Sequence, residues 1–243
     1  MKEKNKVHIS ALRAAFPHTL PIMAGFLFLG ASYGVLMASR GFSFWYPLLT
    51  STVVFAGSME FTLAGLLMGA FAPFEAVLLA LMINARHIFY GISMLPKYRG
   101  LGRKKIYMIF ALCDETFSVV YSATAPTGVD DGWFRFYISL LNHSYWIAGA
   151  TLGGIFGSLL PLDIKGIDFA MTALFVVILI EQIISGVENL TSVLTGLSFS
   201  ALSLFIFGAS DFIIPSMAMM LLILTLLRRP IEALYTRRGE DVS

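Results

Sequence analysis

Apolar runs that could cross a lipid bilayer recur along this chain from Leu20 to Leu227, and they constrain its fold more than any other feature. Several of them approach the roughly 20 residues that a helix needs to cross the hydrocarbon core. Only 13% of the residues are charged, whereas about one quarter is usual for soluble domains. Backbone groups inside a bilayer have to be hydrogen-bonded within the protein, so these runs predict helices. We therefore expect residues 1–243 to form one all-α, polytopic membrane domain.

The chain contains eight apolar segments whose boundaries are soft by a few residues. They cover residues 18–39, 43–70, 74–95, 106–125, 134–160, 166–186, 189–208 and 211–228. Suppose that all eight crossed the membrane, with the basic N-terminus in the cytoplasm. Arg86 aside, nine Lys and Arg residues would then lie inside and seven outside, which fits the positive-inside rule poorly.

The distribution of Lys and Arg fits the positive-inside rule better if segments 43–70 and 166–186 each enter and leave the membrane on the same side. Six full spans then remain. Arg86 aside, fourteen Lys and Arg residues then lie in the cytoplasm and two lie outside. The cytoplasmic set includes both termini and the loop 97–105. The charged residues placed outside are Arg40, Asp130, Asp131 and Arg135.

These two segments also resemble each other in sequence. "GFSFWYPLLTSTVVF" (Gly41–Phe55) aligns with "GIDFAMTALFVVILI" (Gly166–Ile180), and upstream "LGASYG" (Leu29–Gly34) aligns with "LGGIFG" (Leu152–Gly157). The nearly constant spacing predicts an internal duplication. We place the repeats at about 16–125 and 134–228, each with three full spans and one re-entrant or broken helical segment. Three spans per copy would invert the second repeat, a pattern typical of transporters.

Small polar residues and glycines have structural interpretations in these segments. Ser43 and Asp168 occupy equivalent places, and both suit the N-cap of a membrane-inserted half-helix. The glycines of the LGASYG and LGGIFG stretches are most simply explained by close helix packing. These glycines are Gly30, Gly34, Gly153 and Gly157.

The stretch "FAGSMEF" (Phe55–Phe61) predicts a helix break inside segment 43–70. Gly57 and Ser58 can interrupt a helix at mid-depth, where the freed amides need a partner, and a substrate can be one. The N-terminus of a half-helix also offers a partial positive charge to a carboxylate. With Glu60 beside them, Gly57 and Ser58 are candidate site residues.

Arg86 and His87 lie in the middle of the apolar stretch 74–95, together with Asn84. A charge at the centre of a bilayer costs about 2.5–3.5 kcal/mol on insertion scales, so it needs a partner or a watery cavity. The candidate partners are Asp114, Glu115 and Glu60. A buried ion pair that only fixes the helix register is the alternative interpretation. Intramembrane ionisable residues are more often functional, so we expect this group to bind substrate or couple its transport.

Two further motifs favour other interpretations. His143, in "LLNHSYW", is expected to be a packing histidine with its hydrogen bonds satisfied. "GASYG" (Gly30–Gly34) matches the nucleophile-elbow pattern around Ser32 and admits an intramembrane serine hydrolase. That elbow requires a strand–turn–helix context, which is not expected here. An ion channel is the third possibility, and saturable flux against a gradient would exclude it.

Four stretches together resemble the azaleucine-resistance (AzlC-type) branched-chain amino acid permeases over about Phe16 to Leu227. They are "FAGSMEF", "NARH" (Asn84–His87), "DET" (Asp114–Thr116) and "GIDFAMTALFVVIL" (Gly166–Leu179). The resemblance implies a bacterial cytoplasmic-membrane exporter of valine and related amino acids, working beside a small AzlD-type membrane subunit. In the family pattern Glu60 is commonly Gln and Ala85 is commonly Leu.

A branched amino acid zwitterion requires an anion site, a cation site and an apolar pocket. Arg86 or the Gly57 and Ser58 amides could hold its carboxylate, and Glu60 or Asp114 its ammonium. The residues expected to line the apolar pocket are Phe55, Met59 and Phe61. His87 or a buried carboxylate could couple transport to protons. The sequence shows no phosphate-binding loop, metal-ligand set, cofactor motif or nucleic-acid signature.

Overall fold

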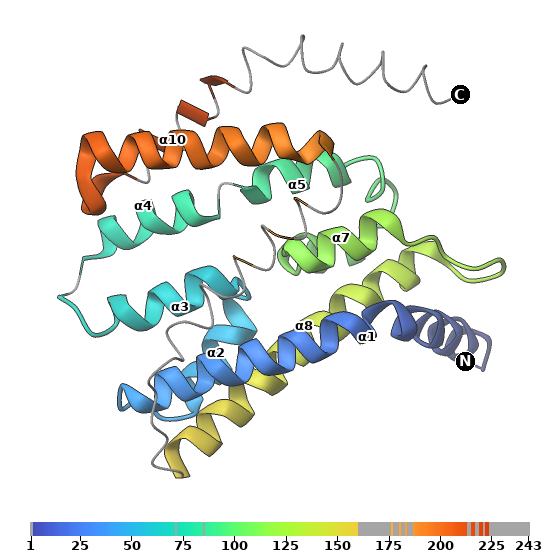
Figure 1. Cartoon of the computed structure of the whole chain (residues 1–243). Helices are drawn as coiled ribbons and strands as arrows, with labels where there is room; N and C mark the ends of the chain where they lie inside the picture. The colour runs from blue at the N-terminus through green and yellow to red at the C-terminus, as the bar shows by residue number, and fades with distance from the viewer. Residues whose placement is uncertain are drawn as a thin grey trace. The chain divides into compact units, whose positions relative to one another are not determined.

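The computed structural model describes residues 2–159 except 71 and 85, residues 187–212, and isolated positions between 176 and 223. This described part contains helices and no strand, as the sequence predicts (Figure 1). The chain forms two compact units, Met1–Met171 and Thr172–Ser243. The predicted segment 166–186, with Asp168, lies mostly outside the described residues, as does most of 211–228.

The described part of the first unit, up to residue 159, consists of two long helices and three pairs of short helices. The long helices are α1 (Lys2–Ser39) and α8 (Asp131–Leu159). The pairs are α2 (Trp45–Val53) with α3 (Gly57–Leu66), α4 (Pro73–Ile83) with α5 (Arg86–Met94), and α6 (Lys104–Phe110) with α7 (Asp114–Ser122). Each pair corresponds to one apolar segment that is interrupted near its middle. We expected breaks only in segments 43–70 and 166–186, so those within 74–95 and 106–125 were missed.

Helices α1 and α8 pack against each other through glycine faces. A Cβ atom added to Gly34 would lie 2.1 Å from the Ala150 carbonyl oxygen, and one added to Gly153 would lie 2.1 Å from that of Ala31. Neither position has room for a side chain, because the two backbones are in contact. The prediction of close packing at these glycines is confirmed.

The two helices run parallel, because contacts advance in the same direction along both. His8 Nδ1 lies 3.0 Å from the Tyr137 hydroxyl, and Thr19 Oγ1 lies 3.1 Å from the Tyr145 hydroxyl. Further along, a Cβ added to Gly157 would meet Val35 and Ala38. Figure 1 shows α1 and α8 side by side in this arrangement.

The α2–α3 pair is a hairpin that enters and leaves at the C-terminal end of α1. Contacts with α1 follow α3 back toward that end: Phe55 faces Phe26, Phe61 faces Tyr33, and Gly65 lies near Arg40. Segment 43–70 therefore returns to the end from which it starts, as predicted. Its first helix lacks the expected side-chain cap at its N-cap, Phe44, although Ser43 Oγ accepts a 3.4 Å hydrogen bond from the Trp45 amide.

The α6–α7 pair is also a hairpin, although segment 106–125 was expected to be a full span. Its contacts with α8 advance and then return. Tyr107 hydrogen-bonds His143 at 2.8 Å, and Thr116 Oγ1 then accepts a 3.2 Å bond from Asn142. The Val120 carbonyl finally accepts a 2.6 Å bond from Arg135. The expectation of a full span here is wrong, because hydropathy alone does not distinguish a hairpin from a span of the same length.

This hairpin changes the topology of the whole unit. The loop 97–105 and Asp130 were expected on opposite sides, yet Lys104 Nζ lies 3.6 Å from Asp130 Oδ1. The predicted inversion of the second repeat is also wrong for its first helix, because α8 runs parallel to α1. The reason is that the α6–α7 hairpin returns the chain to the end where α1 begins. The duplication itself remains a prediction.

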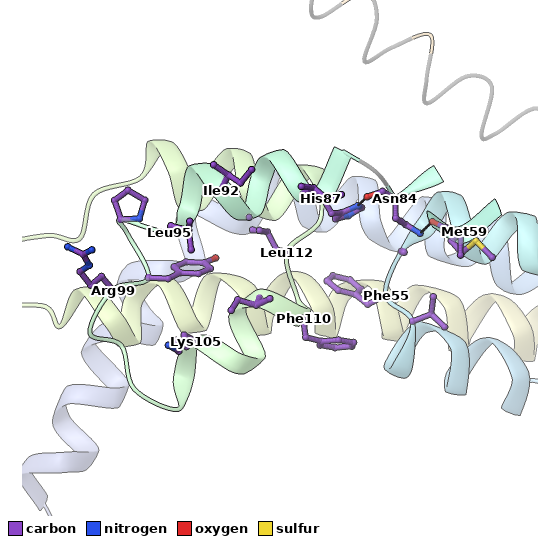
Figure 2. A pocket seen from close by; sticks show the side chains of 18 residues that line it. Phe55, Met59, Asn84, His87, Ile92, Leu95, Arg99, Lys105, Phe110 and Leu112 are labelled. Carbon is purple, nitrogen blue, oxygen red and sulfur yellow. Dashed lines mark hydrogen bonds between the residues drawn. The ribbon is translucent and has the colours of Figure 1, made fainter. Parts of the chain in front are cut away.

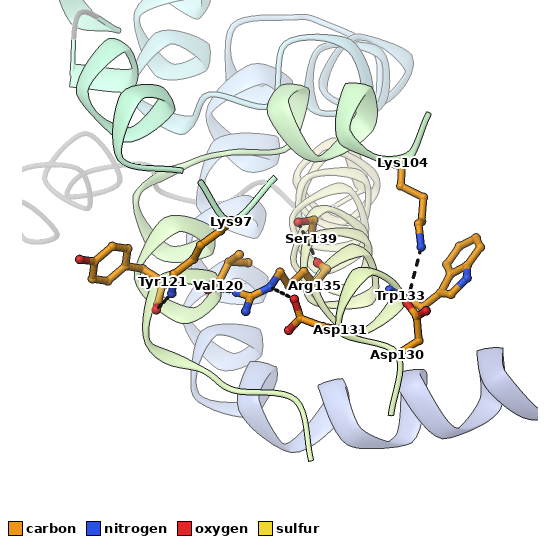
Figure 3. A network of polar contacts seen from close by, with 9 residues as sticks. All are labelled: Lys97, Lys104, Val120, Tyr121, Asp130, Asp131, Trp133, Arg135 and Ser139. Carbon is orange, nitrogen blue, oxygen red and sulfur yellow. Dashed lines mark hydrogen bonds and ion pairs between the residues drawn. The ribbon is translucent and has the colours of Figure 1, made fainter. Parts of the chain in front are cut away.

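Most of the Lys and Arg residues described in the first unit lie at one end of it. Figure 3 shows the polar contacts that Lys97, Lys104 and Arg135 make there. This basic end holds the start of α1, the loop 97–105 and the start of α8. There Arg135, which is 8% exposed, donates from Nε to Asp131 Oδ2 at 2.7 Å and from Nη1 to the Val120 carbonyl. Lys97 donates to the Tyr121 carbonyl. Two cations thus satisfy carbonyls at the C-terminus of α7, where the helix dipole favours positive charge.

The second unit contains α10 (Val187–Asp211), which covers the predicted segment 189–208. Gly208 interrupts it with a φ of 76°, a value that glycine adopts without strain. Among the described residues, one helix, α1 over Lys6–Ser39, is long and apolar enough to cross a membrane by length and composition.

Candidate functional site

Three helix breaks meet in the middle of the first unit, and Arg86 connects them. The breaks fall at residues 54–56, between Ile83 and Arg86, and at 111–113, so that α3, α5 and α7 all begin near the middle of the unit. Arg86 Nη1 lies 2.8 Å from Asp114 Oδ2, and Arg86 Nη2 donates to Ser58 Oγ at 3.0 Å. One guanidinium therefore ties the starts of three half-helices together. Of the two predicted acidic partners on α7, Asp114 forms the ion pair and Glu115 does not.

The pair retains unused hydrogen-bonding capacity. Arg86 Nε and Asp114 Oδ1 are buried and have no hydrogen-bond partner among the described residues. Asp114 lies in the first turn of α7, where a negative charge is favoured by the helix dipole. Arg86 is the first residue of α5, where a positive charge is disfavoured. Arg86 thus depends on its acidic partner more than Asp114 does.

A cavity of about 1060 Å³ extends from these breaks to the basic end of the unit (Figure 2). Asn84, His87 and Met59 lie at its inner end, whereas Arg99 and Lys105 lie at the other end. Its middle is apolar and is lined by Phe55, Ile88, Gly91, Ile92, Phe110 and Leu112, among others. The cavity thus combines polar ends with an apolar wall, the usual composition of a small-molecule site.

The predicted site residues divide into those that line this cavity and those that lie behind it. Asn84 and His87 line it, and Asn84 donates to the Ala80 carbonyl at 2.9 Å. Phe55 and Met59 also line it, as expected, while Phe61 packs on Tyr33 instead. The predicted residues that are not part of the lining are Gly57, Ser58, Glu60, Arg86, Asp114 and Glu115. Glu115 forms no ion pair with a described Lys or Arg residue.

Glu60 is completely buried behind the first break. Its Oε1 accepts hydrogen bonds from the Ala56 amide at 3.1 Å and from Trp146 Nε1 at 2.9 Å. A Cβ added to Gly57 would lie 3.1 Å from the Trp146 ring, so the start of α3 packs closely on α8. Sequence reasoning missed Trp146, because it lies 86 positions from Glu60 and no local pattern connects them.

His143 and Asn142 hold both hairpins against α8. Both ring nitrogens of His143 are hydrogen-bonded, Nδ1 to the Tyr107 hydroxyl at 2.8 Å and Nε2 to the Ser51 carbonyl at 3.1 Å. Asn142 donates to Thr116. The interpretation of His143 as a packing residue with satisfied hydrogen bonds is therefore confirmed.

The hydrolase motif around Ser32 does not form a nucleophile elbow. Ser32 lies inside the continuous helix α1, where its hydroxyl donates to the Phe28 carbonyl at 3.0 Å. Gly30, at the start of the motif, packs against α8. Among the residues that the structure describes, no group of three His, Cys, Asp or Glu side chains could hold a metal ion.

Comparison with known proteins gives one family. The AzlC protein family model matches residues 21–160. The branched-chain amino acid transport protein AzlC of Bacillus subtilis (strain 168) is 57% identical over 92% of this chain and 87% of its own length. An uncharacterized membrane protein of Haemophilus influenzae is 46% identical over 89% and 88%.

A more distant relative is the inner membrane protein YgaZ of Escherichia coli (strain K12). It is 24% identical over 68% of this chain and 70% of its own length. No solved structure matches this chain.

Proposed function

This chain belongs to the AzlC protein family of membrane proteins, and we propose that it transports branched-chain amino acids out of a bacterial cell. The single observation that carries the proposal is the cavity that leads from the basic end to three convergent helix breaks beside Arg86. The name of the Bacillus subtilis relative supports this substrate class.

In the proposed mechanism, the side chain of the amino acid lies against the apolar wall of the cavity near Phe55, Met59 and Ile92. Its carboxylate reaches the inner end at Asn84 and His87 and competes there with Asp114 for Arg86. The unpartnered Arg86 Nε provides capacity for this exchange. A ligand shifts the equilibrium between two conformations only through contacts that differ between them. The exchange of Asp114 for the substrate carboxylate at Arg86 would provide such a difference.

The proposed location is the cytoplasmic membrane, with the basic end and both termini in the cytoplasm. The charge asymmetry supports this orientation. Among the described Lys and Arg residues of the first unit, Arg86 aside, Arg40 lies at the opposite end, whereas the starts of α1 and α8 and the loop 97–105 carry the others. Short cytoplasmic loops are typically enriched in Lys and Arg.

We further propose that a small AzlD-type membrane subunit completes the transporter. Resemblance to the family supports this. The exposed apolar side chains on the short helices, among them Phe74, Val77, Leu81 and Ile106, leave ample surface for lipid or a partner helix. We expect the chain without this subunit to be unstable or inactive.

The test is transport of labelled valine, leucine and methionine by inside-out vesicles that contain the chain, with and without a co-expressed small subunit. The proposal predicts saturable accumulation of valine or leucine that depends on the subunit. Accumulation only in right-side-out vesicles would show import. Flux that neither saturates nor accumulates substrate would favour a channel.

A further inference from the structure

Glu60 is a buried carboxylate for which the transport scheme above gives no role. Its Oε1 accepts two hydrogen bonds from neutral donors, whereas its Oε2 is buried and has no hydrogen-bond partner among the described residues. None of the described Lys, Arg or His residues forms an ion pair with it. An ionised carboxylate in such surroundings is an uncompensated charge, which proteins rarely retain without a reason.

Three described titratable groups on the helices around Glu60 are engaged with other partners. Tyr33 of α1 hydrogen-bonds Thr50 at 2.8 Å. His143 of α8 is bonded to Tyr107 and to the Ser51 carbonyl. Arg86 of α5 is held by Asp114 and by Ser58. Helix α2 carries no charged side chain. None of these three described groups is therefore free to neutralise Glu60.

A substrate ammonium group is also a poor partner for Glu60 in this conformation. The side chain is completely buried and does not line the cavity, although its neighbours Ala56 and Met59 do. A proton, unlike an ammonium group, is small enough to bind at the unpartnered Oε2. The break before α3 is strained, because Phe55 has a φ of 44°, which is uncommon for a residue with a side chain.

We propose that Glu60 binds the proton that couples transport, an inference that rests on the transport function proposed above. An O–H bond forms between the proton and Oε2, the carboxylate charge is cancelled, and the same bond breaks when the proton leaves to water on the other side. Ionised carboxylates accept stronger hydrogen bonds than neutral carboxylic acids. Protonation therefore weakens the hold of Glu60 on Ala56 and Trp146, and it loosens the start of α3 beside the cavity.

The test compares Glu60→Gln with two controls in vesicles that contain the chain and its small subunit. Glutamine keeps an oxygen acceptor for Ala56 and Trp146 but does not bind a proton near neutrality. Trp146→Phe removes the indole donor and keeps the carboxylate. Glu3→Gln makes the same chemical change at the start of α1, far from the breaks.

The measured quantity is the ratio of leucine transport with and without an imposed pH gradient. The proposal predicts a ratio well above one for the unchanged protein and for Glu3→Gln, and a ratio of one for Glu60→Gln whatever its absolute rate. Trp146→Phe should keep the stimulation with an altered dependence on pH. Stimulation that survives in Glu60→Gln, or its absence in the unchanged protein, would overturn the proposal.

A second measurement needs no variant at Glu60 and no transport. Hydrophobic carbodiimides modify protonated carboxyl groups in apolar surroundings, and mass spectrometry identifies the modified residue. The unchanged protein should be modified at Glu60 increasingly as the pH falls. Absence of this modification at every pH would overturn the proposal. If leucine is not transported at all, the proposed substrate fails, and the labelling still decides whether Glu60 binds a proton.

Discussion

Arg86 and Asp114 form an ion pair at the point where α5 and α7 both begin, with 2.8 Å between Nη1 and Oδ2 and with 36% and 25% of their side chains exposed. The pair is therefore accessible enough to exchange partners. A fully buried pair of this kind would be expected to act only as a structural staple.

We expect Arg86→Ala to abolish transport in protein that still inserts and folds, because the substrate carboxylate loses its cation. Arg86→Lys should restore transport poorly, since lysine lacks the planar fork that contacts Asp114 and Ser58 together. These effects are measured as leucine transport per amount of protein in the membrane.

The control for Arg86 is the double variant Arg86→Gln/Asp114→Asn, which leaves no unpaired charge. If this variant folds and transports normally, the ion pair is only structural, and the substrate site has to be sought at Gly57, Ser58 and Glu60.

Gly91 should set the size of side chain that the cavity accepts. It lines the cavity on α5, and a Cβ added there would meet no atom within 4 Å. The Cβ of Gly91→Leu should therefore meet no clash, and the added side chain should reduce leucine transport about tenfold or more, while valine is affected less. Gly25→Leu is the matched control, because its Cβ also meets nothing within 4 Å and it does not line the cavity. Equal losses for both substrates, or for both variants, would exclude this role.

The contact between α1 and α8 should be intolerant of even one methyl group. Gly34→Ala places a carbon 2.1 Å from the Ala150 oxygen, and overpacking of this kind costs about 1–3 kcal/mol or more. We expect a lower thermal midpoint in detergent and less protein in the membrane. Gly25→Ala should leave both unchanged. A Gly34→Ala protein with an unchanged thermal midpoint would contradict the close contact between α1 and α8.

The corrected topology places the loops on both sides of the α6–α7 hairpin at the same membrane face. In a background in which Cys113 is replaced by serine, single cysteines at Gly100 and Gly128 should both be labelled from the cytoplasmic side. A cysteine at Gly41 should be labelled from the outside. If Gly100 and Gly128 react from opposite sides, the segment 106–125 is a full span after all.

The sequence was informative where a local pattern had a local structural cause. Glycines spaced for close packing predicted the α1–α8 contact, and Gly57 with Ser58 predicted a break at the start of α3. The charge inside the apolar stretch around Arg86 predicted an ion pair, with Asp114 or Glu115 of α7 among its candidate partners. In each case the signal is local, a glycine pattern, a break or a charge inside an apolar run.

The sequence was misleading where apolarity alone had to distinguish a span from a hairpin. The apolarity of segment 106–125 predicted one crossing, and no glycine or proline marks its turn. Asp114 was the available signal, because an acidic residue in the middle of an apolar run favours a helix that begins there. Because a full span was predicted here, the second repeat was also predicted to be inverted and Asp130 to lie on the opposite side from the loop 97–105.

The central claim, that the cavity beside Arg86 holds the substrate, is tested most directly by photo-crosslinking with a diazirine analogue of leucine. Sites are mapped by mass spectrometry, with and without excess unlabelled leucine. The account predicts adducts on cavity-lining residues such as Phe55, Met59, His87 and Ile92, and leucine should abolish them. Adducts that leucine does not displace, or displaceable adducts only at residues outside this cavity, would contradict it.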